Sequence, residues 1–319
     1  MTSSQAGRTA NLASPLPRRT YHAPVSGSDA GTATGSPGRG SDLKLAGLLS
    51  RWRSDLAEWA IPDHILKAVP DSPWVLPGQV FARRADRLTA EPAGPSYERA
   101  WAALDPPGSV LDIGSGPGAA CLPLLARTTE LTAVDVDEQM LALLAERSAA
   151  RGVTARCVPG QWPEVASMVP AADVVTCHHV LYNAPELEAF LVALTNHARR
   201  QVIVEIATLH PLTSLNEMWL RFHDLRRPDR PTADDVVEIL REMGVQAGHQ
   251  RWRRAARADY SSFAELTDVT RRRLCLPQQR APEVSDALIE AGVDPENPQD
   301  LGSSGRDVMT IWWAGRAQN

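Results

Sequence analysis

The residue run with the clearest chemical meaning is VLDIGSGPG, at positions 110–118. It joins a β-branched run to three alternating glycines, Gly114, Gly116 and Gly118. This pattern predicts a strand that ends in a tight turn, where missing Cβ atoms let a ligand approach the backbone. A helix expected at 119–127 would present free N–H groups to polar ligand atoms. Asp112 and Ser115 lie in the same run and belong to the expected ligand-binding turn.

An acidic residue, Asp135, ends the next expected strand in the run AVDVD. A carboxylate at that place can accept hydrogen bonds from both hydroxyls of a ribose. A strand, a glycine turn, a helix and a strand-ending acid together favour a nucleoside-bearing cofactor over a simple tight turn. The glycine spacing also fits GxGxxA through Ala119, so a dinucleotide-binding domain stays open as an alternative.

Two adjacent histidines, His178 and His179, follow the fourth expected strand. Ligands of an open α/β sheet bind beyond the carboxyl ends of its strands, so we expect both histidines beside the bound ligand. Imidazole titrates near neutral pH, so either histidine could act as a general base. Packing and backbone capping are the alternative roles for this pair.

Short β-rich runs alternate with helical patterns through most of the chain. The expected strands are 109–113, 131–134, 153–158, 173–177, 201–206, 245–251 and 307–313. Helices are expected between them, with N-terminal caps at Asp137 and Thr232. This alternation predicts an α/β protein with a doubly wound, Rossmann-like, seven-stranded sheet covered on both faces.

Two long connections, 208–231 and 259–305, interrupt the alternation. Connections of this length usually cover or shape a site, so we expect helical lid insertions. The expected acceptor pocket takes four side chains from the strand ends and the first insertion: Tyr182, His210, Trp219 and His223. Core packing is the alternative for Trp219, whose neighbours repeat at helical spacing.

The overall composition is that of an ordinary globular protein. The chain has 319 residues, a formal net charge of −5, 43% hydrophobic and 22% charged residues, which excludes a collagen-like, rod-like or wholly disordered protein. Residues 1–41 are rich in Ser, Thr, Gly, Pro and Ala and are expected to form a disordered tail before a single domain at 42–319.

The four cysteines form no CxxC pair, so we expect neither a disulfide scaffold nor a metal site. The sequence shows no apolar run of about 20 residues and no secretory signal, which favours a cytoplasmic protein.

The run LDIGSGPG, followed by AVDVD and then ADVVTCHHVLYN, resembles the class I S-adenosylmethionine-dependent methyltransferases. The resemblance covers 109–205 and implies a cofactor-binding core at 108–206 with S-adenosylmethionine as cofactor. It implies that Asp112 helps to hold the methionine ammonium and that Asp135 binds the ribose hydroxyls. The glycine turn, with Ser115, would pass beneath the methionine and ribose portions.

The resemblance also implies contacts to the adenine and to the transferred methyl group. Val136 would lie beside the adenine, and His178 would line the cofactor pocket. Many members have an acid after the third strand that reaches the adenine amine. This chain instead has Gln161, which would accept from that amine, and Trp162, which would stack on the ring.

The sequence favours a small-molecule methyl acceptor but leaves further functions open. Residues 179–182 read HVLY, which lacks the NPPY-type tetrad of many nucleic-acid methyltransferases. Residues 251–280 carry eight arginines, so an RNA acceptor that contacts this basic region stays open. The arginines could equally pair with the acidic remainder or bind an anionic small substrate. An NAD-dependent oxidoreductase that uses the same glycine turn and a non-catalytic methyltransferase-like module also stay open.

Overall fold

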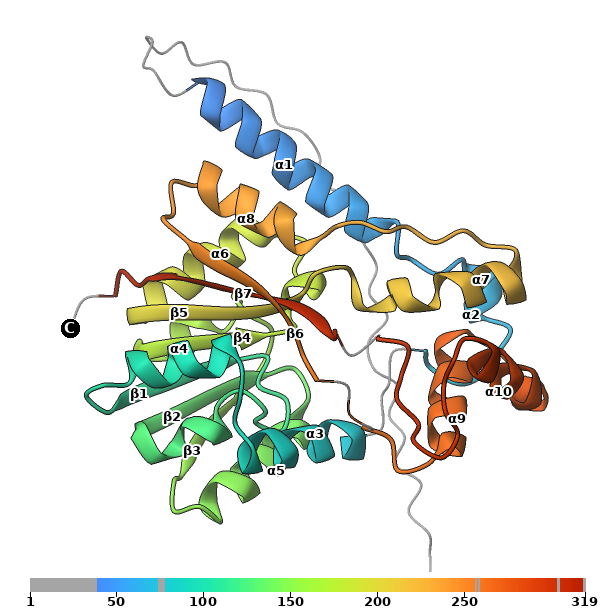
Figure 1. Ribbon diagram of the computed structural model, residues 1–319. Coiled ribbons are helices and arrows are strands. Elements are labelled where there is room, and N and C mark those ends of the chain that lie inside the picture. Colours follow the sequence, from blue (N-terminus) through green and yellow to red (C-terminus); the bar gives the residue numbers. More distant parts are fainter. Residues whose placement is uncertain (1–38, 74–77, 256, 258, 303–304, 318–319) are drawn as a thin grey trace, which may run out of the picture. The chain divides into compact units, whose positions relative to one another are not determined.

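The glycine turn follows β1 (Gly108–Ile113), which is the third strand of a seven-stranded sheet (Figure 1). The computed structural model describes residues 39–73, 78–255, 257, 259–302 and 305–317. The strand order is β3-β2-β1-β4-β5-β7-β6. The strand bounds are β1 Gly108–Ile113, β2 Thr128–Asp135, β3 Ala155–Pro159, β4 Ala172–His178, β5 Ala198–Ala207, β6 Gly248–Arg253 and β7 Asp307–Ala314. The first five strands are parallel, and β7 runs antiparallel to both β5 and β6. The predicted α/β, doubly wound, Rossmann-like sheet is confirmed.

The central strands are apolar on both faces because helices cover both faces. One face packs against α4 (Pro95–Ala103) and α5 (Glu138–Ala149). The other packs against α6 (Leu187–His197) and α8 (Ala233–Glu242), with α1 (Arg39–Ala57) lying across them (Figure 1). The sheet is therefore held rigidly from both sides, which fixes the positions of the strand ends.

Both predicted helix caps are confirmed. The Asp137 carboxylate accepts hydrogen bonds from the backbone N–H of Gln139 and Met140, at 2.9 and 3.2 Å, and α5 begins at the next residue. Thr232 and Asp235 form a capping box at the start of α8. These caps satisfy N–H groups that have no partner within the helix.

Two local predictions were wrong, and one helix was missed. The α-helix expected at 119–127 is a series of turns followed by the 3-10 helix η1 (Leu122–Arg127), because Pro123 has no N–H for helical hydrogen bonding. The strand expected at 245–251 begins later, at Gly248. The helix α3 (Gly78–Ala90) was not anticipated after the Pro-rich stretch that precedes it.

Both long connections are helical, as predicted. Residues 208–231 contain η4 (Pro211–Leu215) and α7 (Asn216–His223), and residues 259–305 contain α9 (Phe263–Arg273), η5 (Gln278–Arg280) and α10 (Ala281–Glu290). Together with α2 (Asp63–Leu66) they form an apolar cluster of their own beside one end of the sheet (Figure 1). We call this group of helices the accessory helices.

The predicted tail at 1–41 lies outside the described residues as far as residue 38. Helix α1 begins at Arg39, so the last three residues assigned to the tail are helical. Among the described helices, none combines the length and the apolarity that a bilayer span requires.

Candidate functional site

The glycine turn after β1 adopts a backbone that other residues rarely adopt. Gly114, Gly116 and Gly118 have φ angles of +66°, +50° and +99°. A Cβ on Gly114 would lie 2.3 Å from Val180 Cγ2, and a Cβ on Gly118 would lie 2.6 Å from Leu122 Cγ. At Gly116 the same position is open, with no heavy atom within 4 Å. The turn is therefore closely packed on either side and open at Gly116, where a ligand can approach the backbone.

Asp135 fixes the turn from the neighbouring strand. Its Oδ2 accepts a hydrogen bond from the Gly116 N–H at 2.7 Å, and its Oδ1 accepts one from the Asp137 N–H at 2.9 Å. A carboxylate offers about four acceptor positions, so each oxygen can also accept from a ligand hydroxyl. Val136, the next residue, is 70% exposed and offers an apolar surface beside this carboxylate.

Asp112 lies buried at the end of β1. Its Oδ1 accepts a hydrogen bond from the Thr176 hydroxyl at 2.8 Å, whereas its Oδ2 has no hydrogen-bond partner among the described residues. Burial raises the pKa of Asp112 to about 7, although the Thr176 bond opposes this shift. An unsatisfied buried oxygen is costly, so a cationic or hydrogen-bond-donating ligand group would be stabilised here.

Strand β4 delivers two histidines to different environments. His179 has a φ of +59°, and its Nε2 lies 3.0 Å from Glu205 Oε1 and 2.9 Å from Arg254 Nη2. His178 Nε2 is buried and has no hydrogen-bond partner in the described part of the chain. Burial lowers the pKa of His178 to about 4, so its imidazole is neutral at physiological pH. His179 is thus held in an ionic network, whereas His178 keeps a ring nitrogen available.

The ionic network centres on Glu205, which sequence reasoning missed. Glu205 is 4% exposed on β5 and forms an ion pair with Arg254, which follows β6. Burial alone would raise the pKa of Glu205, but the Arg254 charge and the His179 hydrogen bond hold it well below its usual range. The available signal was the single acid in the apolar run QVIVEIA at 201–207.

A small cavity of about 40 Å³ lies among these groups. The residues that line it include Thr176, His178, Glu205 and Arg254, together with Trp252 of β6. Its other walls come from α3, α4 and the turn after Gly118. The strand register explains this juxtaposition, because His178 pairs with Glu205 across β4 and β5. The cavity therefore joins the glycine-turn region to the histidine and the ion pair.

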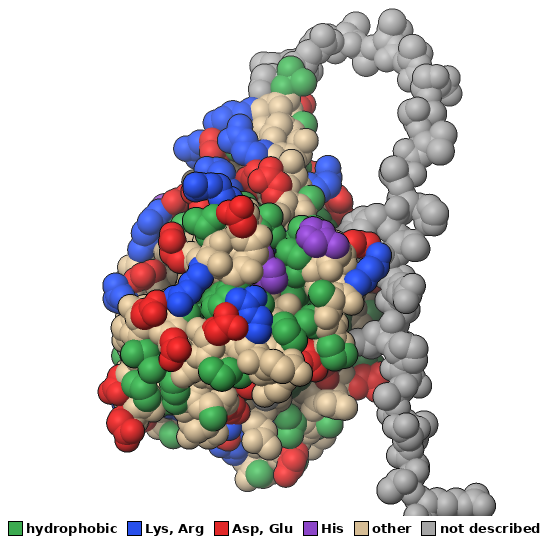
Figure 2. Space-filling model, turned by 90° about the vertical axis from the view of Figure 1, so that its right-hand side faces the viewer, with side chains coloured by type: hydrophobic (Ala, Val, Ile, Leu, Met, Phe, Trp, Pro, Cys, Tyr) green, Lys and Arg blue, Asp and Glu red, His purple; other side chains and the backbone are tan. Residues whose placement is uncertain are grey.

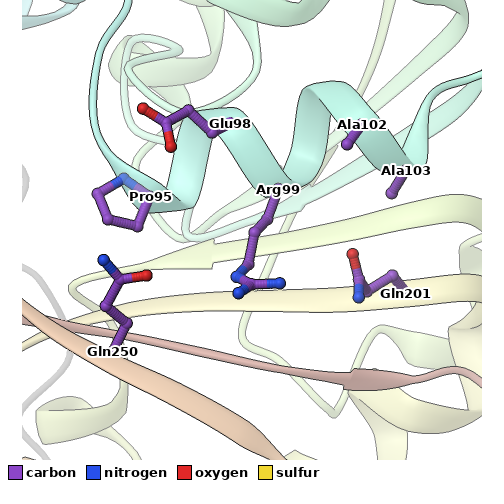
Figure 3. A pocket seen from close by; sticks show the side chains of 7 residues that line it. All are labelled: Pro95, Glu98, Arg99, Ala102, Ala103, Gln201 and Gln250. Atoms are coloured by element: carbon purple, nitrogen blue, oxygen red, sulfur yellow. The ribbon is translucent and has the colours of Figure 1, made fainter.

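A larger groove of about 330 Å³ lies elsewhere, between α4 and strands β5 and β6 (Figure 3). Glu98, Arg99, Gln201 and Gln250 provide its polar groups. The Arg99 guanidinium lies over the Trp312 ring, 3.1 Å from its centroid. None of the predicted site residues lines this groove, so it is not the candidate site.

The four residues expected to line an acceptor pocket pack against aromatic neighbours. His210 stacks on Trp59 at 3.9 Å and meets Tyr182 edge-on at 5.1 Å, while Trp219 lies 4.9 Å from His223. The Arg227 guanidinium lies 5.4 Å from the Trp59 ring and 5.1 Å from the Trp219 ring. These contacts join the accessory helices to the sheet. None of the four lines the small cavity, and packing is the role that their positions support.

The two residues expected near the adenine lie in different surroundings. Trp162 is 5% exposed, meets His197 edge-on at 4.8 Å and donates from Nε1 to the Phe190 carbonyl at 3.4 Å. Its ring packs in the core, and the expected stacking on adenine stays a prediction. Gln161 is partly exposed and follows Gly160, whose N–H donates to the Asp135 carbonyl at 2.9 Å. Gln161 therefore stays beside the strand end that carries Asp135.

The basic region at 251–280 is largely neutralised by acids. At least seven of its eight arginines form ion pairs: Arg251, Arg253, Arg254, Arg257, Arg271, Arg272 and Arg280. On the face drawn in Figure 2, acidic side chains lie among the basic ones. This arrangement favours pairing over a continuous phosphate-binding surface. Within the described residues, no group of three His, Cys, Asp or Glu side chains is arranged to hold a metal ion.

The comparisons with known proteins include one family match, which covers part of the chain. Residues 110–201 match the family model described as a methyltransferase domain. Among curated proteins, none matches the chain.

Solved structures similar to this chain include three methyltransferases. The magnesium protoporphyrin IX methyltransferase from Synechocystis, with bound S-adenosylhomocysteine, is 16% identical, with 86% of this chain and 98% of that chain covered and a TM-score of 0.44. A SAM-dependent methyltransferase from Archaeoglobus fulgidus is 15% identical, with 72% and 94% covered and a TM-score of 0.42. The plantazolicin methyltransferase, with bound S-adenosylhomocysteine, is 12% identical, with 86% and 98% covered and a TM-score of 0.43.

Proposed function

We propose that this chain, whose residues 110–201 match a methyltransferase-domain family model, is a class I S-adenosylmethionine-dependent methyltransferase that transfers a methyl group to a small-molecule acceptor. S-adenosylmethionine is the cofactor of this family. The observation that carries the proposal is the open glycine turn at Gly116, placed between the carboxylates of Asp112 and Asp135. We assign residues 108–206 as the cofactor-binding core of a domain at 42–319.

The residues at the end of β1 fit this cofactor. The buried Asp112 Oδ2 would accept a hydrogen bond from the methionine ammonium. Asp135 would accept from the ribose hydroxyls, and Val136 and Gln161 would lie along the adenine. The open position at Gly116 lets the cofactor approach the backbone, and Ser115 and the flanking glycines form the rest of this turn. When bound, the cofactor supplies an electrophilic methyl group on a sulfonium, which is a good leaving group.

His178 is the stronger candidate for the base that deprotonates a hydroxyl or amine acceptor. Its Nε2 is buried, faces no hydrogen-bond partner among the described side chains and borders the cavity. His179 would position Glu205 and Arg254, because its own Nε2 already lies between them. A positioned base contributes about 10²–10⁴-fold to such a reaction, and correct orientation of the acceptor contributes more.

A small-molecule acceptor is favoured by the closed surroundings of the cavity and by the paired arginines of 251–280. The accessory helices at 208–231 and 259–305 would cover this site and exclude water. We place the enzyme in the cytoplasm, as its cysteine usage suggests. An RNA acceptor would need a continuous basic surface, and the ion pairs of this region do not favour one.

Calorimetry with S-adenosylhomocysteine tests the cofactor assignment. Asp135→Ala is expected to weaken binding at least tenfold, because it removes the acceptor of the ribose hydroxyls. Glu138→Ala is the matched control, since it removes an exposed carboxylate three residues away. Equal affinity in wild type and Asp135→Ala would refute the site, and tight binding of NAD⁺ in place of S-adenosylhomocysteine would favour the oxidoreductase.

A labelling experiment tests the acceptor class. Methyl-tritiated S-adenosylmethionine is incubated with the protein and a lysate of the source cell, which is then fractionated. Label in the small-molecule fraction supports the proposal, and nuclease-sensitive label refutes it. Binding of S-adenosylhomocysteine without transfer to any fraction would favour a non-catalytic module.

A further inference from the structure

The larger groove, of about 330 Å³, lies outside the proposed catalytic site (Figure 3). We call it the α4 groove, because α4 forms one wall and strands β5 and β6 contribute the other. Its volume is within the range of small-molecule sites in proteins. Ser96 and Tyr97 of α4 line the small cavity, whereas Glu98 and Arg99 line the groove. No described residue lines both, so the two hollows lie on different sides of the same helix.

Trp312 of β7 supports the arginine of the α4 groove. Strand pairing places Trp312 opposite Gly248, and a Cβ on Gly248 would lie 2.4 Å from Trp312 Cε2. The missing side chain at Gly248 therefore leaves room for the indole ring across β6. The Arg99 guanidinium lies over this ring, 3.1 Å from its centroid. Such stacking is favourable for arginine and fixes the plane of the guanidinium.

The Arg99 guanidinium keeps its hydrogen-bond donors available. It has no hydrogen bond or ion pair with any residue that the structure describes. A guanidinium carries five N–H groups in its plane, so contact of one face with the indole leaves its edges open. The side chain is half-buried. A cation that is partly withdrawn from water and has no acidic partner in the described chain would be stabilised by an anion.

Two amide side chains flank Arg99. Figure 3 shows Arg99 pointing from α4 toward the strands, with Gln250 of β6 on one side and Gln201 of β5 on the other. Each glutamine is two residues from a ladder partner of Trp312, so both side chains lie on the sheet face that carries the indole. Neither amide has a hydrogen bond to another described residue. The groove therefore offers further N–H donors on both sides of the guanidinium.

The charges of the α4 groove select the kind of anion. Arg99 is the one cation among the described residues that line it, and the exposed Glu98 points away from the strands in Figure 3. A dianion such as a phosphate ester would be repelled by Glu98 and only half neutralised by Arg99. A carboxylate has a single charge and two oxygens that match a guanidinium edge. Apolar contacts for the rest of the ligand come from one side of α4: Pro95, Ala102 and Ala103.

We propose that the α4 groove binds a small organic acid, whose carboxylate pairs with Arg99 between the amides of Gln201 and Gln250. The groove is separate from the cavity beside His178, so this inference does not depend on the proposed function.

Fluorine NMR with para-fluorobenzoate, at constant ionic strength above pH 7, tests the proposal. Two ligands of similar shape serve as matched probes. The first, para-fluorobenzamide, is neutral, and the second, para-fluorophenyl phosphate, is largely a dianion at this pH. The wild-type protein is expected to bind para-fluorobenzoate at least tenfold more tightly than either.

Variants locate the binding. Arg99→Gln removes the cation and is expected to weaken para-fluorobenzoate binding at least tenfold, whereas Arg99→Lys keeps the charge without the paired N–H groups and should recover part of the affinity. Gln250→Glu leaves Arg99 on Trp312 but adds a competing carboxylate at an exposed position, so it should also weaken binding at least tenfold. Arg51→Gln is the matched control, because it removes an exposed cation from α1, on the other face of the sheet. Thermal unfolding verifies that each variant folds, and Gln250→Glu decides the question if Arg99→Gln does not.

Several outcomes would overturn the proposal. It is wrong if para-fluorobenzoate does not bind, if para-fluorobenzamide binds equally well, or if Gln250→Glu keeps the wild-type affinity. An equal loss in Arg51→Gln and Arg99→Gln would indicate a general effect of charge and refute the site. Tighter binding of para-fluorophenyl phosphate would refute the assignment to carboxylates. S-adenosylhomocysteine binding is measured in parallel, and its absence would refute the proposed function while leaving this inference standing.

Discussion

Removing Arg254 should leave a carboxylate buried without its cation. Glu205 is 4% exposed, and its low pKa depends on the Arg254 charge and on the His179 hydrogen bond. Breaking a buried ion pair from one side costs about 3–5 kcal/mol. Because 1 kcal/mol shifts the Tm of a large domain by about 2–4 °C, Arg254→Met is expected to lower the Tm by roughly 6–20 °C at pH 7.5.

The pH dependence of this loss identifies its cause. In wild type the folded-state pKa of Glu205 lies well below the ordinary value, so Glu205 stays ionised from pH 7.5 to 5 and its contribution is constant. In Arg254→Met, burial raises that pKa above the unfolded value. A raised folded pKa gives stability that is lost as the pH rises through it, so the variant regains stability on acidification. The Tm difference between the two proteins should therefore narrow between pH 7.5 and 5.

Differential scanning calorimetry at both pH values measures this effect, and titrations common to the two proteins cancel in the difference. Arg253→Met is the matched control and should change the Tm little, because exposed ion pairs contribute about 0–1 kcal/mol. The double variant Glu205→Gln, Arg254→Met removes the buried charge and should recover much of the loss. A Tm loss that is the same at pH 5 and 7.5, or that the double variant does not reduce, would refute the argument.

Two further predictions concern the groups without hydrogen-bond partners. Asp112→Asn should raise the Tm of the unliganded protein at pH 8, because a folded pKa of about 7 makes the ionised carboxylate destabilising there. This gain in Tm should shrink as the pH is lowered toward 5. The same variant should bind S-adenosylhomocysteine at least tenfold more weakly than wild type. Once an acceptor is known, kcat of the wild-type protein should be level from pH 6 to 7 and fall as the pH approaches about 4, where His178 becomes protonated. His178→Asn should lower kcat by about 10²–10⁴-fold and change the S-adenosylhomocysteine affinity little. An unchanged kcat in that variant would assign the base elsewhere.

The sheet and the glycine turn were predictable because their signals are local. The run VLDIGSGPG contains both the strand and the turn, and the positive φ angles of its glycines agree with the close approach that was inferred. The caps at Asp137 and Thr232 were equally local, since each depends on residues within one helical turn. Prediction failed at 119–127, where Pro123 weakened a helix that the surrounding apolar residues favoured.

The ionic network could not be predicted from the sequence. Glu205 and Arg254 are 49 residues apart, and they meet because β7 lies between β5 and β6 and pairs antiparallel with both strands. Arg254 is one of the eight arginines of 251–280, and nothing in the sequence distinguishes it from the others, although its side chain is only 16% exposed. For a related reason, the sequence could not separate the two possible roles of the expected acceptor-pocket residues. Helical spacing identified Trp219 as apolar and inward-facing, but the same spacing describes a residue that packs and a residue that lines a pocket.

The two histidines show most clearly what the sequence leaves undetermined. They are adjacent and chemically identical, so either could be named as the base from the sequence. The strand ends between them: His178 is the last residue of β4 and is paired with Glu205, whereas His179 turns into the left-handed region and its N–H donates to the Glu205 carbonyl at 2.7 Å. That turn directs the His179 ring into the ionic network and leaves the His178 Nε2 without a partner among the described residues. The choice of base therefore depends on which residue makes the last ladder pair, and that boundary is set by the neighbouring strand.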